Sequence, residues 1–136
     1  MGAAENKQLM RHIFSELSKG NSRPFVESMA DDFRWTVTGA TPWSKTYEGK
    51  QAVLNELLGQ LRSRFGEPVR VTAHRFIAED DYVVVEARGE NNVTTAGVPY
   101  NNTYCFVFRL ADGAVREVTE YLDTALVLTA LAGADT

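Results

Sequence analysis

The first half of the chain has the hydrophobic spacing of amphipathic helices. Apolar residues recur there every three to four positions, which places them on one face of a helix. The first predicted helix ends before Gly20, a residue type that is common just after a helix. A second, short helix is expected to begin near Pro24, and a third to run from Lys50 to Gly66. The apolar stripe of the first helix consists of Leu9, Met10, Ile13, Phe14 and Leu17.

Alternating apolar and polar residues predict strands in the rest of the chain. A short strand is expected over 33–38, and the Gly- and Pro-containing stretch 39–48 is expected to be a loop. After the third helix the hydrophobic period changes to two, and a short apolar segment, 125–131, follows the last strand. The strands expected in this second half are 69–78, 82–91, 100–110 and 114–122. Helices followed by an antiparallel meander predict a single α+β domain over 1–136, with the helices packed on one face of the sheet.

The connections between these strands predict which side chains share a face. We expect the turn after Leu110 to pair this residue with Ala114. We expect the loop after Asn91 to pair that residue with Tyr100. One face then collects Val83, Val85, Ala87, Gly89, Asn102, Tyr104, Phe106, Phe108, Val118, Glu120 and Leu122. The other collects Glu86, Arg88, Glu90, Asn101, Thr103, Cys105, Arg109, Glu117, Thr119 and Asp123. The first set is the predicted interior, and Glu120 is its one carboxylate.

Glu120 is therefore the first candidate for chemistry. Burial disfavours the charged form of a carboxyl group, so the pKa of Glu120 should rise toward neutrality unless a cation compensates. A general acid or base at neutral pH needs such a pKa. Tyr104, which this pairing places directly across from Glu120, is expected to donate a hydrogen bond to it or to a ligand oxygen. In the alternative hypothesis, Glu120 has only a structural role and satisfies a buried tyrosine, an arginine or a backbone group.

A second group of side chains is expected to surround a ligand. Its members are Trp35, Trp43, His74, Asn102, Phe106 and Phe108. Trp43 lies in the Gly- and Pro-containing loop, where it would form a lid over an opening. His74 points inward if the 79–81 turn closes over two residues and outward if it closes over three.

Composition and charge exclude several classes of protein. The chain has 136 residues, a formal net charge of −4 and no long apolar run, so neither a nucleic-acid surface nor a membrane span is expected. The single cysteine, Cys105, excludes an internal disulfide framework and fits the cytoplasm. Two histidines and one cysteine without ligand spacing do not build a transition-metal site, and no cofactor motif is present. We expect a cytoplasmic protein without a metal or cofactor.

Several short segments resemble those of a known family. They are Ala30-Asp31-Asp32-Phe33-Arg34-Trp35, Tyr47-Glu48-Gly49-Lys50, Pro99-Tyr100-Asn101-Asn102 and the closing segment 112–123. With the order of elements, they resemble the SnoaL-like proteins of the nuclear transport factor 2-like superfamily. The resemblance implies a cone-shaped, curved, mostly antiparallel sheet of the cystatin-like kind, wrapped around the N-terminal helices and enclosing an apolar pocket. Members include ketosteroid isomerases, limonene epoxide hydrolases, polyketide cyclases and modules without catalysis, so the fold does not fix the chemistry.

The residues of the ketosteroid isomerases do not carry over to this chain. Their first-helix tyrosine falls near Ile13, and their aspartate base falls within 38–40, where the chain has no carboxylate. Their protonated aspartate falls at Tyr104 or Cys105. A ketosteroid isomerase mechanism is therefore not expected.

The Asp-Arg-Asp arrangement of the limonene epoxide hydrolases carries over in part. Its second aspartate falls on Glu120, a conservative match, while its arginine and first aspartate fall on Ala87 and Gly89. A shift of one residue would offer Arg88 and Glu90 instead. The predicted faces send these two outward, unless a bulge in their strand reverses its sides.

The resemblance and the predicted interior together indicate a pocket protein. We expect it to bind or convert a small, largely apolar metabolite, polyketide-like, aromatic or epoxide-like, by cofactor-free acid/base chemistry as a cyclase, isomerase or hydrolase. The alternative is a non-catalytic ligand-binding or dimerisation module with a filled interior. We also expect a homodimer through the outer sheet face, which carries Cys105, Val107 and Tyr121.

Overall fold

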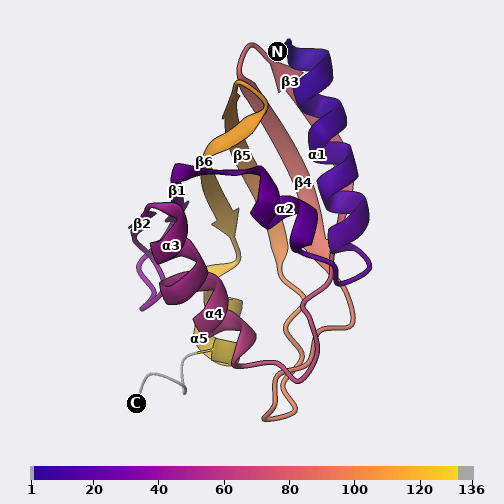
Figure 1. Ribbon diagram of the computed structural model, residues 1–136. Coiled ribbons are helices and arrows are strands. Elements are labelled where there is room, and N and C mark those ends of the chain that lie inside the picture. Colours follow the sequence, from indigo (N-terminus) through magenta and orange to yellow (C-terminus); the bar gives the residue numbers. More distant parts are fainter. Residues whose placement is uncertain (1, 132–136) are drawn as a thin grey trace.

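One mixed sheet organises the computed structural model, which describes residues 2–131 (Figure 1). In this part of the chain the strand order is β2-β1-β6-β5-β4-β3, with β1 and β6 parallel and every other neighbouring pair antiparallel. The strands are β1 (Met29–Val37), β2 (Thr46–Glu48), β3 (Val71–Glu79), β4 (Tyr82–Gly89), β5 (Thr103–Ala111) and β6 (Ala114–Leu122). The helices are α1 (Ala3–Leu17), α2 (Arg23–Ser28), α3 (Lys50–Ala52), α4 (Gly59–Arg62) and α5 (Thr124–Leu131), with a π-helical segment, η1 (Val53–Leu58), between α3 and α4.

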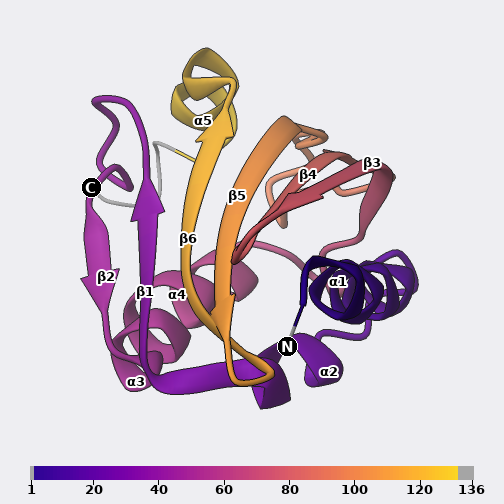
Figure 2. The same ribbon diagram turned by 90° about the horizontal axis from the view of Figure 1, so that it is seen from above.

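The sheet is strongly curved, and most of the helices lie on its concave side. Figure 2 shows α1 against β3 and β4, and α2, α3 and α4 along the same side toward β1. The buried face of α1 presents Met10, Ile13 and Phe14 from the predicted stripe to the sheet. This arrangement confirms the predicted α+β architecture, a curved and mostly antiparallel sheet wrapped around N-terminal helices. None of the helices among residues 2–131 is long and apolar enough to cross a membrane.

The pairing of β4 with β5 agrees with the sequence prediction. Val83 lies opposite Phe108, and Val85 lies opposite Phe106. All four of these side chains are buried. The predicted interior set is buried throughout, apart from Leu122, which is half-buried. The predicted sides of the meander are therefore correct.

The hairpin between β5 and β6 differs from the prediction in its register. The turn pairs Ala111, not Leu110, with Ala114, and the extra residue Arg116 then forms a β-bulge. A two-residue turn alone would have reversed the sides of β6, and the bulge restores them because it adds one residue to one strand.

This register changes which residue faces Glu120. Glu120 lies opposite Phe106, and Tyr104 lies opposite Leu122. The prediction that Tyr104 is directly across from Glu120 is therefore wrong by two positions along β6. A shift of two keeps every side chain on its predicted face, so both residues still point inward.

A second bulge determines the direction of His74. The turn between β3 and β4 pairs Glu79 with Tyr82 and so closes over two residues, which by itself would point His74 inward. The register shifts between Ala73 and Arg75, however, and His74 is the additional residue. Its side chain is exposed, with Nε2 3.9 Å from a carboxylate oxygen on the outer face of β4.

The first half of the chain differs from the prediction at two strands. β1 begins at Met29, four residues earlier than expected, because this residue already pairs with β6. The strand β2 lies inside the predicted loop 39–48 and pairs Trp35 with Tyr47. A strand of three residues is too short to show an alternating pattern.

Candidate functional site

A cavity of about 190 Å³ lies between the concave face of the sheet and the helices. Its wall is mostly apolar and aromatic, and it meets the surface at the exposed residues Ser22 and Arg62. It is lined by Phe14, Leu17, Gly20, Ser22, Phe25, Trp35, Leu57, Leu58, Leu61, Arg62, Pro68, Val69, Val71, Tyr104, Phe106, Phe108 and Glu120. The interior is therefore not completely filled, and of the predicted site residues Trp35, Tyr104, Phe106, Phe108 and Glu120 meet in it.

Glu120 is the one carboxylate in this wall. It stands on β6 with 8% of its surface exposed. The indole Nε1 of Trp35, on the neighbouring strand β1, donates a hydrogen bond of 2.9 Å to its Oε1. Within residues 2–131 no Lys, Arg or His side chain forms an ion pair with it, and Oε1 takes its one side-chain hydrogen bond from Trp35. The structure thus leaves this carboxyl group without a cation.

The burial of Glu120 changes its proton affinity. Desolvation raises the pKa of Glu120 to about 7, and the hydrogen bond from Trp35 lowers it in part. One neutral donor does not replace the hydration that a carboxylate has in water. At neutral pH both protonation states are therefore populated, and the group can give or take a proton.

Tyr104 reaches the same cavity from β5, next to a chain of polar groups. Its ring stacks on Phe106 with 5.0 Å between the centroids. Its hydroxyl lies near that of Tyr100, which accepts a 3.1 Å hydrogen bond from Nδ2 of Asn102. Burial raises the pKa of Tyr104 well above its ordinary value and that of Tyr100 to about 12. Both hydroxyls therefore remain neutral and can donate hydrogen bonds.

Aromatic rings form most of the remaining wall. Phe14 and Phe25, from the two N-terminal helices, pack against Phe106 and Phe108 of β5 with centroid separations of 5.7 to 6.1 Å. Trp35 adds a third side, 5.8 Å from Phe25 and 6.4 Å from Phe106. Such a surface suits flat, apolar ligands, because aromatic rings pair edge-to-face or in offset stacks.

Asn102 lies outside the cavity and joins two strands. Its Nδ2 donates to the carbonyl of Asp123, and its Oδ1 accepts from the backbone N–H groups of Thr103 and Asp123. With the bond to Tyr100, every donor and acceptor of the amide is in use. The structure gives Asn102 the role of a tie between β5 and the end of β6, not that of a cavity wall.

Trp43 and His74 also lie away from the cavity. Trp43 is 7% exposed, with the guanidinium group of Arg64 5.0 Å from its ring centre, and does not cover the opening as a lid. His74 is exposed beside Glu86 on the outer face. Arg88 and Glu90 are exposed as well, so the one-residue shift of the epoxide hydrolase pattern brings no further charged group to Glu120.

The sequence analysis missed the contribution of Arg62 to the cavity wall. The predicted third helix contains η1, and a π-helical turn adds one residue to the helical turn. The helix surface that follows is rotated by about 100° as a result. Leu61 and Arg62, just beyond η1, both line the cavity. Arg62 follows Leu58 by four residues, so the i, i+4 spacing of the predicted third helix was the signal that could have placed it on the same face.

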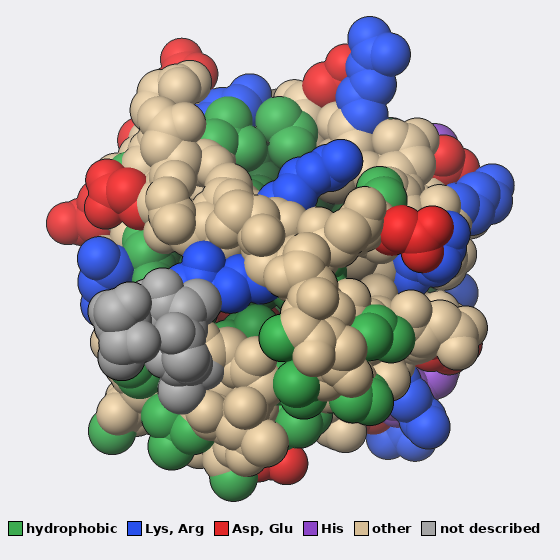
Figure 3. Space-filling view, turned by 90° about the horizontal axis from the view of Figure 1, so that it is seen from below, with side chains coloured by type: hydrophobic (Ala, Val, Ile, Leu, Met, Phe, Trp, Pro, Cys, Tyr) green, Lys and Arg blue, Asp and Glu red, His purple; other side chains and the backbone are tan. Residues whose placement is uncertain are grey.

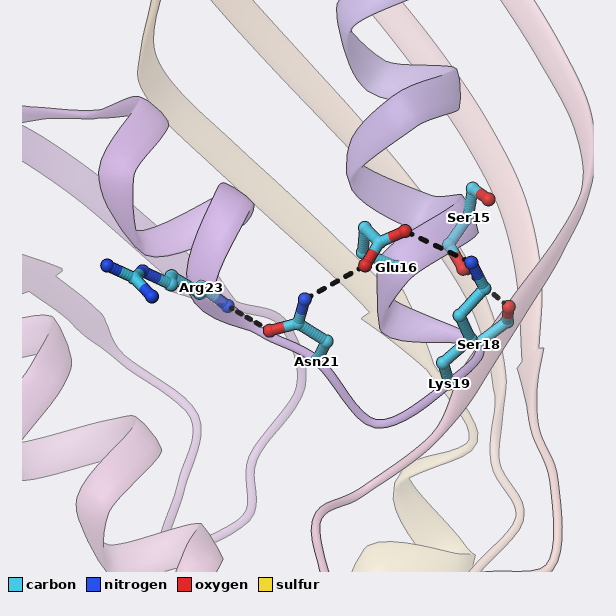
Figure 4. Close-up of polar contacts among 6 residues, drawn as sticks. All are labelled: Ser15, Glu16, Ser18, Lys19, Asn21 and Arg23. Atoms are coloured by element: carbon cyan, nitrogen blue, oxygen red, sulfur yellow. Dashed lines mark hydrogen bonds and ion pairs between the residues drawn. The ribbon is translucent and has the colours of Figure 1, made fainter.

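The corner between α1 and α2 forms one edge of the cavity mouth, and Figure 4 shows the polar contacts within this corner. Glu16 accepts hydrogen bonds of 3.2 Å from Nζ of Lys19 and 2.9 Å from Nδ2 of Asn21. The hydrogen bond from Asn21, and then the hydrogen bond from Lys19, lower the pKa of Glu16, so its carboxyl group remains ionised at neutral pH. Gly20 and Ser22 lie within this corner and line the mouth.

Residues 2–131 contain no cluster of three or more His, Cys, Asp or Glu side chains that could hold a metal ion. The polar groups in the cavity wall are those of Glu120, Tyr104 and the Trp35 indole, together with Ser22 and Arg62 at the mouth.

Comparison with known proteins places this geometry in context. Residues 10–118 match the family model of the SnoaL-like domain. No curated protein matches the sequence.

Solved structures share the fold over nearly the whole chain. An NTF2-like protein of unknown function from Burkholderia pseudomallei K96243 superposes with a TM-score of 0.78 at 19% identity, covering 93% of this chain and 96% of that one. A putative SnoaL-like polyketide cyclase from Jannaschia sp. CCS1 gives 0.75 at 23% identity, covering 96% and 93%. TerC, co-crystallised with polyporic acid, gives 0.74 at 17% identity, covering 92% and 96%. At these identities the similarity concerns the fold.

Proposed function

Because the chain belongs to the SnoaL-like family, we propose that it binds a small, largely apolar metabolite in the concave-face cavity and converts it by cofactor-free acid/base chemistry. The observation that carries this proposal is the isolated carboxyl group of Glu120 in an aromatic wall. It is buried, it accepts one side-chain hydrogen bond, and it forms no ion pair within the described chain. A carboxyl group in this setting exchanges its proton near neutral pH, as general acid–base catalysis requires.

Glu120 would act first as a base and then as an acid. Its carboxylate takes a proton from a carbon next to a carbonyl group, and the bonding electrons move onto the carbonyl oxygen. The carboxylic acid then returns the proton to another carbon, or to the same one, and the carbonyl group is restored. With an epoxide, the carboxylate takes a proton from the attacking water and returns it to the oxygen of the opened ring. Both cycles regenerate the enzyme without a cofactor.

Tyr104 is the hydrogen-bond donor that we propose for the developing oxyanion. Its hydroxyl lies near that of Tyr100, which accepts a hydrogen bond from Nδ2 of Asn102. A hydroxyl hydrogen rotates freely about its C–O bond, so Tyr100 can donate to Tyr104 while Tyr104 donates to a ligand. A neutral donor held in a buried site stabilises negative charge better than water does, because it needs no reorganisation.

The size of the cavity favours a ligand of one or two rings. An apolar cavity of about 150 Å³ admits benzene, and the cavity here measures about 190 Å³. The names of two similar structures support an aromatic or polyketide-like ligand, since one is a putative polyketide cyclase and the other was co-crystallised with polyporic acid.

A non-catalytic binding module is the second candidate function. The positions that match the arginine and the first aspartate of the epoxide hydrolases hold Ala87 and Gly89, both buried. Glu120 therefore has no charged catalytic partner in the described chain. In this second function, Glu120 only satisfies the indole of Trp35 while the cavity holds a ligand unchanged.

Two simple probes separate these functions. 2-Tetralone, a two-ring ketone with exchangeable α-hydrogens, tests proton abstraction by NMR in D2O, and styrene oxide tests hydration. We expect one probe to react, and Glu120→Gln to lower its rate constant at least a hundredfold, the usual minimum for a general base. The matched control is Glu90→Gln, which removes an exposed carboxylate outside the cavity.

Each other outcome has a definite meaning. Turnover that survives Glu120→Gln would refute the role of this residue. Binding by calorimetry without turnover of either probe would favour the non-catalytic module. Absence of binding by every one- and two-ring probe tested would refute the ligand cavity itself.

We also propose that the protein is a homodimer through the outer face of β4, β5 and β6. Tyr121 is 50% exposed there, and Val107 and Cys105 on β5 are half-buried. An ion pair of 3.1 Å between Arg109 and Glu117 lies on the same face. Apolar residues next to internally paired charges form a surface on which a second copy can pack without burying an unpaired charge.

A further inference from the structure

One arginine side chain lines the mouth of the cavity, and a second lies close to it beside Gly20. Arg62 is exposed and lines the cavity directly. The Nε atom of Arg70 lies 3.7 Å from the point where a β-carbon on Gly20 would stand, and Gly20 is part of the cavity wall. Arg62 projects from α4 and Arg70 precedes β3, so two separate elements bring positive charge to one opening.

The backbone of Arg70 is held in place by a side chain. Oδ1 of Asn92 accepts a 2.9 Å hydrogen bond from the Arg70 N–H, and Nδ2 of Asn92 donates a 2.9 Å hydrogen bond to the Arg70 carbonyl. Asn92 is buried. These two hydrogen bonds with the Asn92 side-chain amide fix the backbone position from which the Arg70 side chain extends.

Neither arginine is neutralised by a carboxylate. Within residues 2–131, Arg62 and Arg70 form no ion pair, whereas the neighbouring cations Lys19 and Arg23 are paired with Glu16 and Glu27. Glu67 lies in the loop between the two arginines and lines a second cavity of about 280 Å³ with Arg70, without an ion pair to it.

The interior of the cavity disfavours a negatively charged group, in contrast to the mouth. Its walls are apolar, and its charged group is the buried carboxyl of Glu120. An anion placed beside Glu120 would lose its hydration and meet a like charge, and both effects are unfavourable. The negative group of a ligand therefore belongs at the mouth. On the molecular face in Figure 3, Lys and Arg side chains lie beside recessed hydrophobic side chains.

We propose that the ligand is a one- or two-ring carboxylate whose charged group is held by Arg62 and Arg70 while its rings enter the cavity and its neutral end faces Glu120. This inference rests on the proposed function, since it assumes that the cavity binds a small apolar molecule. Guanidinium groups suit this task because their planar donors match the two oxygens of a carboxylate. The arrangement also orients the ligand, since only one end is accepted at the mouth.

Arg62 can also stabilise its own helix, and the test must distinguish this role from the binding of a carboxylate. It lies in the last turn of α4, where a positive charge interacts favourably with the helix dipole. That role would affect the stability of the protein but not its preference between a charged and a neutral ligand of the same shape.

The experiment compares 2-naphthoate with 2-naphthamide, which has the same rings and a similar shape but no charge. Calorimetry gives both dissociation constants for the wild type, Arg62→Gln, Arg70→Gln and the control Arg88→Gln. Arg88 is an exposed arginine on the outer face that also lacks an ion pair in the described chain. Circular dichroism establishes that each variant is folded.

We expect the wild type to prefer 2-naphthoate by roughly tenfold, the usual value of one charge-assisted hydrogen bond. Each mouth variant should lose most of this preference while still binding 2-naphthamide, and Arg88→Gln should keep it. Raising NaCl from about 0.05 to about 0.5 M should weaken only the binding of 2-naphthoate, because salt screens exposed charges.

The results also separate this inference from the proposed function. If the wild type binds both probes equally, or if both mouth variants keep the preference, the anion site is refuted while the apolar cavity stands. If neither probe binds to the wild type, the ligand cavity and the anion site are refuted together.

Discussion

The indole of Trp35 donates its hydrogen bond to Glu120 across the parallel pairing of β1 with β6. Val37 is the register partner of Glu120, so Trp35 reaches it diagonally from two residues earlier on the same face. These strands are far apart in the sequence, because the donor and the acceptor are separated by 85 positions. The contact gives the buried carboxyl group one fixed partner and leaves it open to the cavity, so both its proton affinity and its position depend on the β1–β6 pairing.

The first prediction concerns the pH dependence of stability. Folding raises the pKa of Glu120 from 4.5 to about 7, so the native state binds a proton more tightly than the unfolded state does. This contribution to stability is complete below pH 4.5 and is lost as the pH rises to about 7. The loss should be about 3 kcal/mol of unfolding free energy. Urea unfolding at a series of pH values measures it.

Glu120→Gln should remove this part of the pH dependence, because the amide does not titrate. The variant should then be more stable than the wild type above pH 7, by up to the same amount. The control Glu90→Gln, an exposed carboxylate outside the cavity, should retain the wild-type profile. Identical profiles for the wild type and Glu120→Gln would contradict the burial of an unpaired carboxyl group.

The second prediction separates the two tryptophans. Trp35→Phe removes the donor that lowers the pKa of Glu120, so this pKa should rise further and the stability loss should extend to higher pH. Trp43→Phe is the matched control, because Nε1 of Trp43 is buried without a hydrogen-bond partner within the described chain. A chemical-shift titration of the labelled Glu120 carboxyl carbon measures the change. An unchanged midpoint in Trp35→Phe would show that the indole does not control the proton.

The third prediction assigns Asn102 a structural role. Asn102→Ala removes a buried side-chain amide whose donors and acceptors are all hydrogen-bonded. It leaves the backbone N–H of Thr103 and the backbone N–H and carbonyl of Asp123 without their side-chain partner. Loss of such a network should cost about 2 to 4 kcal/mol of unfolding free energy, measured by urea unfolding. Asn101→Ala, at the exposed neighbouring position, removes one hydrogen bond and should cost less. Equal effects of the two substitutions would contradict the tie.

The fourth prediction tests the proposed dimer. Tyr121→Lys places a charge on the outer face of β6, where Tyr121 is half exposed, and should convert the dimer to monomers of 15.1 kDa. Ile77→Lys is the control, since Ile77 is similarly exposed but lies on the edge strand β3, outside the proposed surface. Sedimentation equilibrium at micromolar concentration measures both. A monomeric wild type would refute the proposal.

The sequence predicted the faces of the meander because its alternation leaves little choice of side. The direct pairing of Tyr104 with Glu120 was wrong because the number of residues in a turn does not reveal a bulge at Arg116. His74 could not be assigned for the same reason, since its own bulge reverses the effect of the two-residue turn.

Sequence patterns did not predict the contacts between elements that are distant in the chain. The parallel pairing of β1 with β6 brings Trp35 to Glu120, and no local signal specifies such a pairing. Arg62 lines the cavity four residues after Leu58, and helical spacing alone does not show whether a polar residue beside an apolar stripe faces a cavity or solvent. Trp43 looked like a lid because aromatic residues in Gly- and Pro-rich loops are often exposed, but here it is buried by tertiary contacts.

The bulge at Arg116 makes the chemistry of the cavity depend on chain length. Removing this one residue would leave the later pairs of β6 unchanged, because Arg116 has no partner, and Glu120 would still lie opposite Phe106. Inserting one more residue there, with the bulge still taking up only one, would move every later residue of β6 to the other side, so that Thr119 would enter the cavity and Glu120 would leave it. No substitution is needed for that exchange. Within this fold, a single-codon insertion at the bulge would therefore replace an ionisable interior with a neutral one, and a deletion there could restore it.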